Sequence, residues 1–161
     1  MLTLRSEANI GEGKTDALNH VIDRIQASVS NRTYDHIYGI GDKALLIVND
    51  VAIQISVRED ATGVYLVGIS TKASHDLTVR KHGTGLGTSA ILALKEYADK
   101  ARKPFAVVGA TTSSSSYYDK FDWLQKGFVE LYFEEGIYSP NNELNSNYIY
   151  KPNIDGTKRE H

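Results

Sequence analysis

The chain has 161 residues, of which 41% are hydrophobic and 24% are charged, with a formal net charge of -2 and no cysteine. This length suits one globular domain, and the nearly balanced charge excludes a general electrostatic field for nucleic acid. The lack of cysteine excludes disulfides, thiolate catalysis and cysteine-ligated zinc.

The N-terminal part of the chain predicts one amphipathic helix and then an antiparallel meander. Apolar residues recur every three or four positions across residues 15–30, which places them on one helix face. Extended segments follow at 34–40, 43–48, 51–57 and 64–71. The dipeptide Asn49-Asp50 indicates a tight turn between the second and third of these, so we expect them to pair as a hairpin.

A β-α-β unit is predicted after the meander. A glycine-rich loop leads into a helix at 86–101, whose apolar positions again share one face, and Pro104 marks its far boundary. The short apolar run at 105–110 is typical of a strand that is covered on both faces. Because a helix joins the two strands, 105–110 should lie parallel to 64–71.

The C-terminal part predicts a short helix at 118–121, a strand at 127–133, a polar loop at 134–146 and a last strand at 147–150. Residues 152–161 lack apolar periodicity, so we expect a mobile tail after a single domain at 1–151. The first residues carry no apolar signal core, and no apolar run approaches the roughly 20 residues that span a bilayer. These patterns predict a cytoplasmic protein without membrane contact.

The glycine-rich loop indicates phosphate binding. Gly83, Gly85 and Gly87 allow backbone amides to approach a ligand closely, and the following helix directs its positive end at the same place. A P-loop requires Gly-x-x-x-x-Gly-Lys-Ser/Thr, which is absent here. A Rossmann fingerprint requires Gly-x-Gly-x-x-Gly early in alternating β-α units, whereas this loop follows several antiparallel strands.

The segment Arg80-Lys-His-Gly83-Thr-Gly85 resembles the Arg/Gln-x-x-Gly-x-Gly/Ala signature of the GNAT superfamily of acyl-CoA-dependent N-acetyltransferases. The order of elements over residues 15–151 is similar to that family as well. A second segment, Tyr117-Tyr-Asp-Lys-Phe-Asp-Trp123, looks like the family's Phe-Tyr-Glu-Lys-Leu-Gly-Phe. Another register sets Gly127-Phe128 on the Gly-Phe pair and puts Trp123 in the place of the tyrosine. We prefer the first register because more side chains match in character.

The resemblance implies an α/β (α+β) fold with a mixed, mostly antiparallel central sheet, a splayed parallel strand pair and helices on both faces. It implies transfer of an acetyl group from acetyl-CoA to a primary amine by direct attack, without a metal. The pyrophosphate and pantetheine would contact a run of twelve residues. These are Leu77, Thr78, Val79, Arg80, Lys81, His82, Gly83, Thr84, Gly85, Leu86, Gly87 and Thr88.

The same resemblance makes Tyr118 the general acid that protonates the leaving thiol. Many relatives place a glutamate base on the strand before the loop, but 64–71 contains no acidic residue. The residues that flank this strand and could act as the base are Glu59, Asp60, His75 and Asp76. Acidic residues near the end of a later strand would attract a cationic acceptor, namely Glu130, Glu134 and Glu135.

The missing glutamate motivates an alternative, in which the chain is a catalytically silent acyl-CoA-binding or protein-interaction module on the same fold. A preference for longer acyl groups is a third hypothesis. The segment 70–79 is longer than the family's usual approach to the loop and is interpreted as either displaced coenzyme contacts or an inserted substrate-facing loop. The amine acceptor, small molecule or protein, is not specified by the sequence, and the exposed final strands are compatible with a homodimer.

Overall fold

The computed structural model describes residues 2–6, 16–28, 34–40, 42–81, 83–111, 117–133, 136–138 and 145–152. Two helices, α1 (Asp16–Ser28) and α2 (Leu86–Ala101), lie among these residues. The strands in the same residues are β1 (Leu2–Arg5), β2 (Tyr34–Ile40), β3 (Lys43–Val48), β4 (Val51–Asp60), β5 (Gly63–Ala73), β6 (Asp76–Arg80), β7 (Phe105–Thr111), β8 (Gln125–Phe133), β9 (Gly136–Tyr138) and β10 (Asn145–Tyr150). The predictions for His82, Glu134, Glu135 and the tail from residue 153 fall outside the described residues.

The strands form one mixed sheet in the order β1-β8-β10-β7-β5-β4-β3-β2, with β6 added beside β5 and β9 beside β8. The meander from β2 to β5 is antiparallel, as predicted. Its predicted hairpin is confirmed, because Val48 lies opposite Val51. Asn49 between them has φ 56°, a left-handed conformation that asparagine tolerates better than most residues. The helix α2 connects β5 to β7, and these two strands are parallel, as the β-α-β prediction requires.

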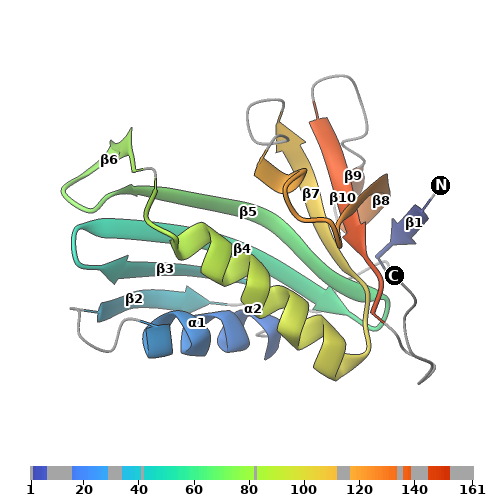
Figure 1. The fold of residues 1–161 in the computed structure, drawn as a ribbon, viewed down its shortest axis with the longest axis horizontal. Helices are drawn as coiled ribbons and strands as arrows, with labels where there is room; N and C mark the ends of the chain where they lie inside the picture. The colour runs from blue at the N-terminus through green and yellow to red at the C-terminus, as the bar shows by residue number, and fades with distance from the viewer. Residues whose placement is uncertain are drawn as a thin grey trace.

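Both described helices cover the same face of the sheet (Figure 1). Helix α1 packs against α2, and the apolar stripe of α1 meets alternate residues of β3, β4 and β5 in one hydrophobic core. A second cluster, on strands β1, β5, β7, β8 and β10, contains no residue of either helix. The prediction of helices on both faces is therefore wrong for the described residues. Helical periodicity identifies a buried face, but it does not say on which side of the sheet a helix packs.

The parallel pair β5 and β7 stays together over a short distance only. The register joins Val64 through Leu66 to Phe105 through Val107. Beyond this point β5 continues along β4 to Ala73, whereas β7 continues along β10 to Thr111. At the point of separation β5 carries a bulge, because Ser56 pairs with Gly68 while Val57 pairs with Leu66, and Val67 is the extra residue. A bulge bends its strand, so the two strands diverge as Figure 1 shows.

Candidate functional site

The glycine loop has the backbone that the sequence predicts. Gly83 has φ 69° and Gly85 has φ 78°, and residues with a Cβ rarely adopt such values. A Cβ built on either glycine would meet nothing within 4 Å, so the space above the loop is open. Gly85 is the N-cap of α2 and its position carries no side-chain cap hydrogen bond. The loop therefore leaves the N-terminal end of the helix accessible.

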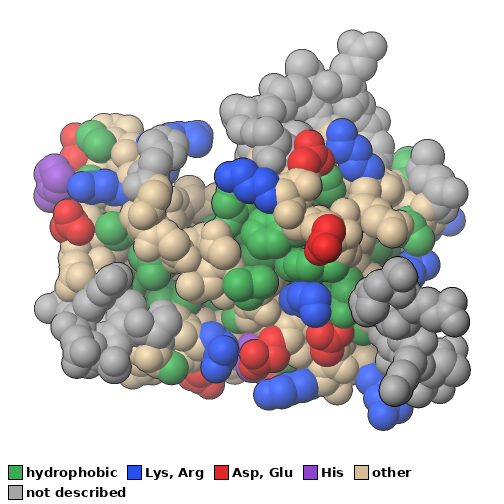
Figure 2. Space-filling view, viewed as in Figure 1, with side chains coloured by type: hydrophobic (Ala, Val, Ile, Leu, Met, Phe, Trp, Pro, Cys, Tyr) green, Lys and Arg blue, Asp and Glu red, His purple; other side chains and the backbone are tan. Residues whose placement is uncertain are grey.

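The first turn of α2 is suited to an anion. The first N–H groups of a helix have no partner inside the helix, and the macrodipole adds positive charge there. The amide of Leu86 reaches the Thr84 hydroxyl at 3.3 Å, which is a long bond. No acidic residue lies in the first turn, so the positive end is not neutralised from within the helix. Figure 2 shows the surface hollowed above this end of α2, beside the β5–β6 hairpin.

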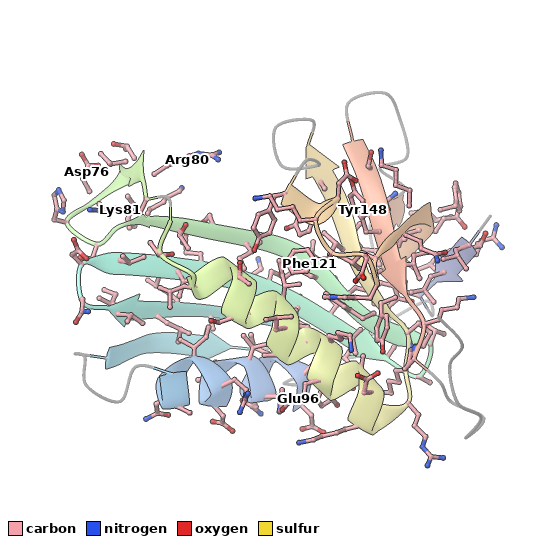
Figure 3. The ribbon with its side chains drawn as sticks, viewed as in Figure 1. Asp76, Arg80, Lys81, Glu96, Phe121 and Tyr148 are labelled. Carbon is pink, nitrogen blue, oxygen red and sulfur yellow. The ribbon has the colours of Figure 1, made fainter. Side chains whose placement is uncertain are left out.

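Two cations stand at the start of the loop. Arg80 is exposed at the end of β6, and its side chain reaches toward the hollow (Figure 3). The ammonium of Lys81 lies 3.3 Å from Asp50, a side chain that is 69% exposed. An exposed ion pair of this kind contributes at most about 1 kcal/mol, so Lys81 can exchange Asp50 for a phosphate oxygen at little cost.

The long approach to the loop is a hairpin excursion. The amide of Lys81 donates to the carbonyl of Thr71 at 3.1 Å, and the Thr71 hydroxyl donates to the carbonyl of Lys81 at 2.7 Å. Residues 72–80 thus form a hairpin that begins after Thr71 and returns to it at Lys81. In the register Ala73 lies opposite Asp76 and Lys72 opposite Arg80, so 77–79 project from the ladder.

Because of this excursion, a different part of the backbone lines the splay, which is the region where β5 and β7 diverge. The resemblance implied coenzyme contacts from Leu77, Thr78 and Val79, which the structure places on the exposed, projecting part of β6. The β5 residues that follow the point of separation, 67–71, run from the bulge directly to the loop. The length of 70–79 predicted either displaced coenzyme contacts or an inserted loop, but it did not predict the pairing of β6 with β5, because a hairpin and a simple long loop can have the same number of residues.

Tyr118 is buried and belongs to the segment of the chain that connects β7 to β8. It is helical, and bonds from Lys120 N to Tyr117 O and from Phe121 N to Tyr118 O continue the turn. Its ring contacts Tyr117 at 5.2 Å and Tyr148 at 5.6 Å between centroids. Burial, followed by the two neighbouring tyrosines, raises the pKa of Tyr118 to about 12. The hydroxyl therefore stays protonated at neutral pH, as a proton donor must.

Glu59 is a half-buried residue near the end of β4. It lies beside the beginning of β5, at the end of that strand farther from the glycine loop. Its Oε2 accepts hydrogen bonds from the Tyr97 hydroxyl at 2.5 Å and from the Lys103 ammonium at 2.9 Å, and its Oε1 accepts one from the amide of Ala17. It pairs with Val64, which lies about 23 Å along the strand from Thr71 at the usual rise per residue. These contacts give Glu59 a structural role.

The other base candidates lie at chain turns. His75 is exposed in the turn between β5 and β6. Asp76 accepts hydrogen bonds from the hydroxyl and the amide of Thr78, and these bonds lower the pKa of Asp76, which weakens it as a base. Asp60 closes the turn before β5 by accepting from Thr62 and Gly63. The structure does not bring these groups together with Tyr118.

Replacing Glu59 tests its structural role. Glu59→Ala leaves Lys103, Tyr97 and the first turn of α1 without their acceptor, and we expect the free energy of unfolding to fall by about 3 kcal/mol. Glu59→Gln keeps an acceptor oxygen and is expected to lose about 1 kcal/mol. Urea denaturation measures both. Unchanged stability of Glu59→Ala, combined with lost turnover, would return Glu59 to the role of base.

Among the described residues, no three His, Asp or Glu side chains gather in a way that could hold a metal ion. No helix in the described part of the chain is long and apolar enough to cross a membrane. A scan against models of protein families found no match, and a search of curated proteins found none either.

Proposed function

We propose that the chain is a GNAT-like N-acetyltransferase that transfers an acetyl group from acetyl-CoA to a primary amine. The observation that carries the proposal is the splay of β5 and β7, which begins at a bulge and stands beside the glycine-capped end of α2. Such an opening admits an extended chain between two strands while the helix end takes its phosphates. The glycine signature and the order of elements support the same family.

The coenzyme would bind along this line. Its pyrophosphate lies over Gly83 to Thr88, where open glycines meet the first amides of α2, with Arg80 and Lys81 as counter-charges. Its pantetheine arm lies along residues 67–70 of β5, which have parted from β7 and precede Thr71, whose carbonyl is bound by Lys81. An extended amide chain adds to a free strand edge through main-chain hydrogen bonds. The thioester then reaches the bulge at Val67, where the ladder is interrupted.

The chemistry requires a neutral amine, a thioester and a proton for the departing thiolate. An amine with a lysine-like pKa near 10.4 costs roughly 4 to 5 kcal/mol to deprotonate at pH 7, whereas a thiol with a pKa near 8.5 leaves more readily. The nitrogen of the neutral amine attacks the carbonyl carbon, the C–S bond breaks, and Tyr118 donates its proton to sulfur. The proton that the acylated nitrogen then loses returns the Tyr118 oxygen to its neutral form. The high pKa of Tyr118 keeps its proton available across the working range.

A catalytically silent acyl-CoA-binding or interaction module is the second candidate. It is favoured by the contacts of the acidic candidates, since Glu59, Asp60 and Asp76 each accept hydrogen bonds from their own surroundings. An acyl-CoA-binding module would still bind the coenzyme, because the loop and the splay do not depend on a base, whereas a protein-interaction module would bind a protein partner only.

Acetyl-CoA binding and turnover separate the two. Calorimetry measures binding, and release of free thiol measures transfer to a panel of small amines, lysine peptides and charged tRNA. Competition among CoA thioesters of increasing length tests the preference for longer acyl groups. The enzyme requires thiol release that depends on an amine. Binding without release across the panel supports the silent acyl-CoA-binding module. Absence of binding contradicts both the enzyme and that module, and leaves the protein-interaction module.

A further inference from the structure

A pair of hydroxyl groups joins the first turn of α2 to the turn that holds Tyr118. The Tyr117 hydroxyl lies 2.6 Å from the Thr88 hydroxyl, a short hydrogen bond between residues 29 positions apart. Thr88 is the third residue of α2, so this bond reaches the turn that the glycine loop opens. A Cβ on Gly87 would lie 3.9 Å from the same tyrosine oxygen, which confirms that the hydroxyl rests against the beginning of the helix.

The ring of Tyr117 is held on several sides. It meets Tyr118 edge-on at 5.2 Å and Phe121 edge-on at 5.5 Å, and the Lys120 ammonium lies 5.5 Å from its centroid. Edge-on aromatic pairs of this kind are favourable beyond the area that they bury. Tyr117 therefore touches both neighbours in the turn while its hydroxyl is fixed to another element.

Tyr118 lies in a short helical turn, and its ring is oriented by two aromatic neighbours, the first of which is Tyr117. Its other ring contact is Tyr148 of β10, whose hydroxyl donates to Asp119 at 2.9 Å. The turn is thus attached to β10 on one side through Tyr148. On the α2 side, the turn is held by the Thr88 bond to Tyr117 and by apolar packing, since Tyr118 belongs to the same core cluster as the buried face of α2. Loss of that bond would loosen Tyr117, whose ring contacts the Tyr118 ring.

We infer that Tyr117 is a positioning residue for Tyr118, acting through its hydrogen bond with Thr88. The bond holds the turn against the end of α2 at which the coenzyme phosphates are proposed to bind. This inference rests on the proposed function because it takes Tyr118 as the acid. Tyr117 itself need not touch the reacting atoms. Its effect is to keep the neighbouring ring in one orientation and out of water.

Three variants isolate the bond. Tyr117→Phe removes one hydroxyl and keeps the ring, Thr88→Val removes the other with little change in shape, and Thr88→Ser keeps a hydroxyl in place. Ser89→Ala is the matched control, because it deletes a hydroxyl from the next residue of the same helix. We expect Tyr117→Phe and Thr88→Val each to lower kcat about tenfold, and the double variant to lose no more than either. KM for acetyl-CoA should stay unchanged in Tyr117→Phe, which alters no residue of the proposed coenzyme site.

An independent readout does not require turnover. NMR of ring-labelled tyrosines between pH 8 and 11, with Tyr118→Phe to assign the signal, follows the ionisation of Tyr118. In the native chain its signal should stay constant over this range, because burial raises its pKa to about 12. In Thr88→Val, which keeps the Tyr117 hydroxyl, the signal should begin to titrate, and in Thr88→Ser and Ser89→Ala it should not. Tyr117→Phe is left out of this readout, because the Tyr117 hydroxyl is itself one of the causes that raise the pKa of Tyr118.

The outcomes separate the two proposals. If the native chain releases no thiol with any amine, the proposed function fails, and the titration of Tyr118 alone decides whether Tyr117 positions it. A lower melting temperature with unchanged kcat and unchanged titration overturns the inference, since the bond would then be structural only. Reduced kcat with unchanged titration also overturns it, because Tyr117 would then act directly.

Discussion

Replacement of Gly85 by glutamate is expected to weaken acetyl-CoA binding by at least about 100-fold, as measured by calorimetry. The side chain would enter the open space above the loop, which the pyrophosphate is proposed to occupy. Its carboxylate would also place negative charge at the positive end of α2, where it repels a phosphate and neutralises the helix end. Binding is lost through both effects while the core is untouched.

The matched control is Gly85→Asn. Gly85 has φ 78°, so any side chain adds backbone strain, but asparagine adopts this conformation more readily than glutamate and carries no charge. We expect Gly85→Asn to lose far less affinity, and circular dichroism should show both variants folded. Equal affinity of the two variants for acetyl-CoA would mean that the N-terminal end of α2 is not part of the coenzyme site.

Tyr118→Phe is expected to lower turnover about 100-fold, the usual scale for loss of a general acid, with little change in the affinity for acetyl-CoA. Phenylalanine fills nearly the same buried volume, so the contacts with Tyr117 and Tyr148 persist. Steady-state thiol release and calorimetry measure the two quantities. The control is Tyr132→Phe, which deletes a hydroxyl from a half-buried tyrosine on β8. Turnover that is equal in the two variants would exclude Tyr118 as the acid.

The raised pKa of Tyr118 also predicts the direction of an alkaline effect on stability. The folded chain holds this proton up to a pKa of about 12, whereas the unfolded chain releases it near 10.0. The folded state therefore binds more protons between these values, and its stability declines as the pH rises from about 10 to 12. Urea denaturation in this range should show a weaker decline for Tyr118→Phe than for the native chain. Equal declines would mean that the hydroxyl is not protected from ionisation.

The elements that were predicted correctly depend on local patterns. The hairpin at Asn49-Asp50 follows from turn chemistry between two apolar runs, and α2 follows from its apolar stripe between a glycine loop and Pro104. The strand β6 was missed because its five residues are all exposed, and an exposed strand has no alternation of burial to display. Strand β4 extends to Asp60 because its partner β5 continues beside it.

The site shows the same division between local and distant information. The left-handed glycines and the open helix end are local features, so the sequence contains them. The role of Glu59 depends on Ala17, Tyr97 and Lys103, which come from α1, from α2 and from the segment after α2. Only the folded chain brings these together. The Thr88–Tyr117 bond was missed for the same reason, although two hydroxyl residues next to predicted functional segments were the available signal.

The pairing of β1 with β8 determines when β1 can enter the sheet. Leu2 lies beside Gly127 and Arg5 beside Glu130, where the Arg5 guanidinium binds the Glu130 carboxylate at 2.6 Å. A ribosome must therefore have released the chain beyond residue 130 before its first strand finds a partner. The segment that forms β1 waits until residues 127–130 have been made, and contacts so distant in sequence form slowly. Nascent chains held at intermediate lengths would carry β1 as an unpaired strand, open to other chains.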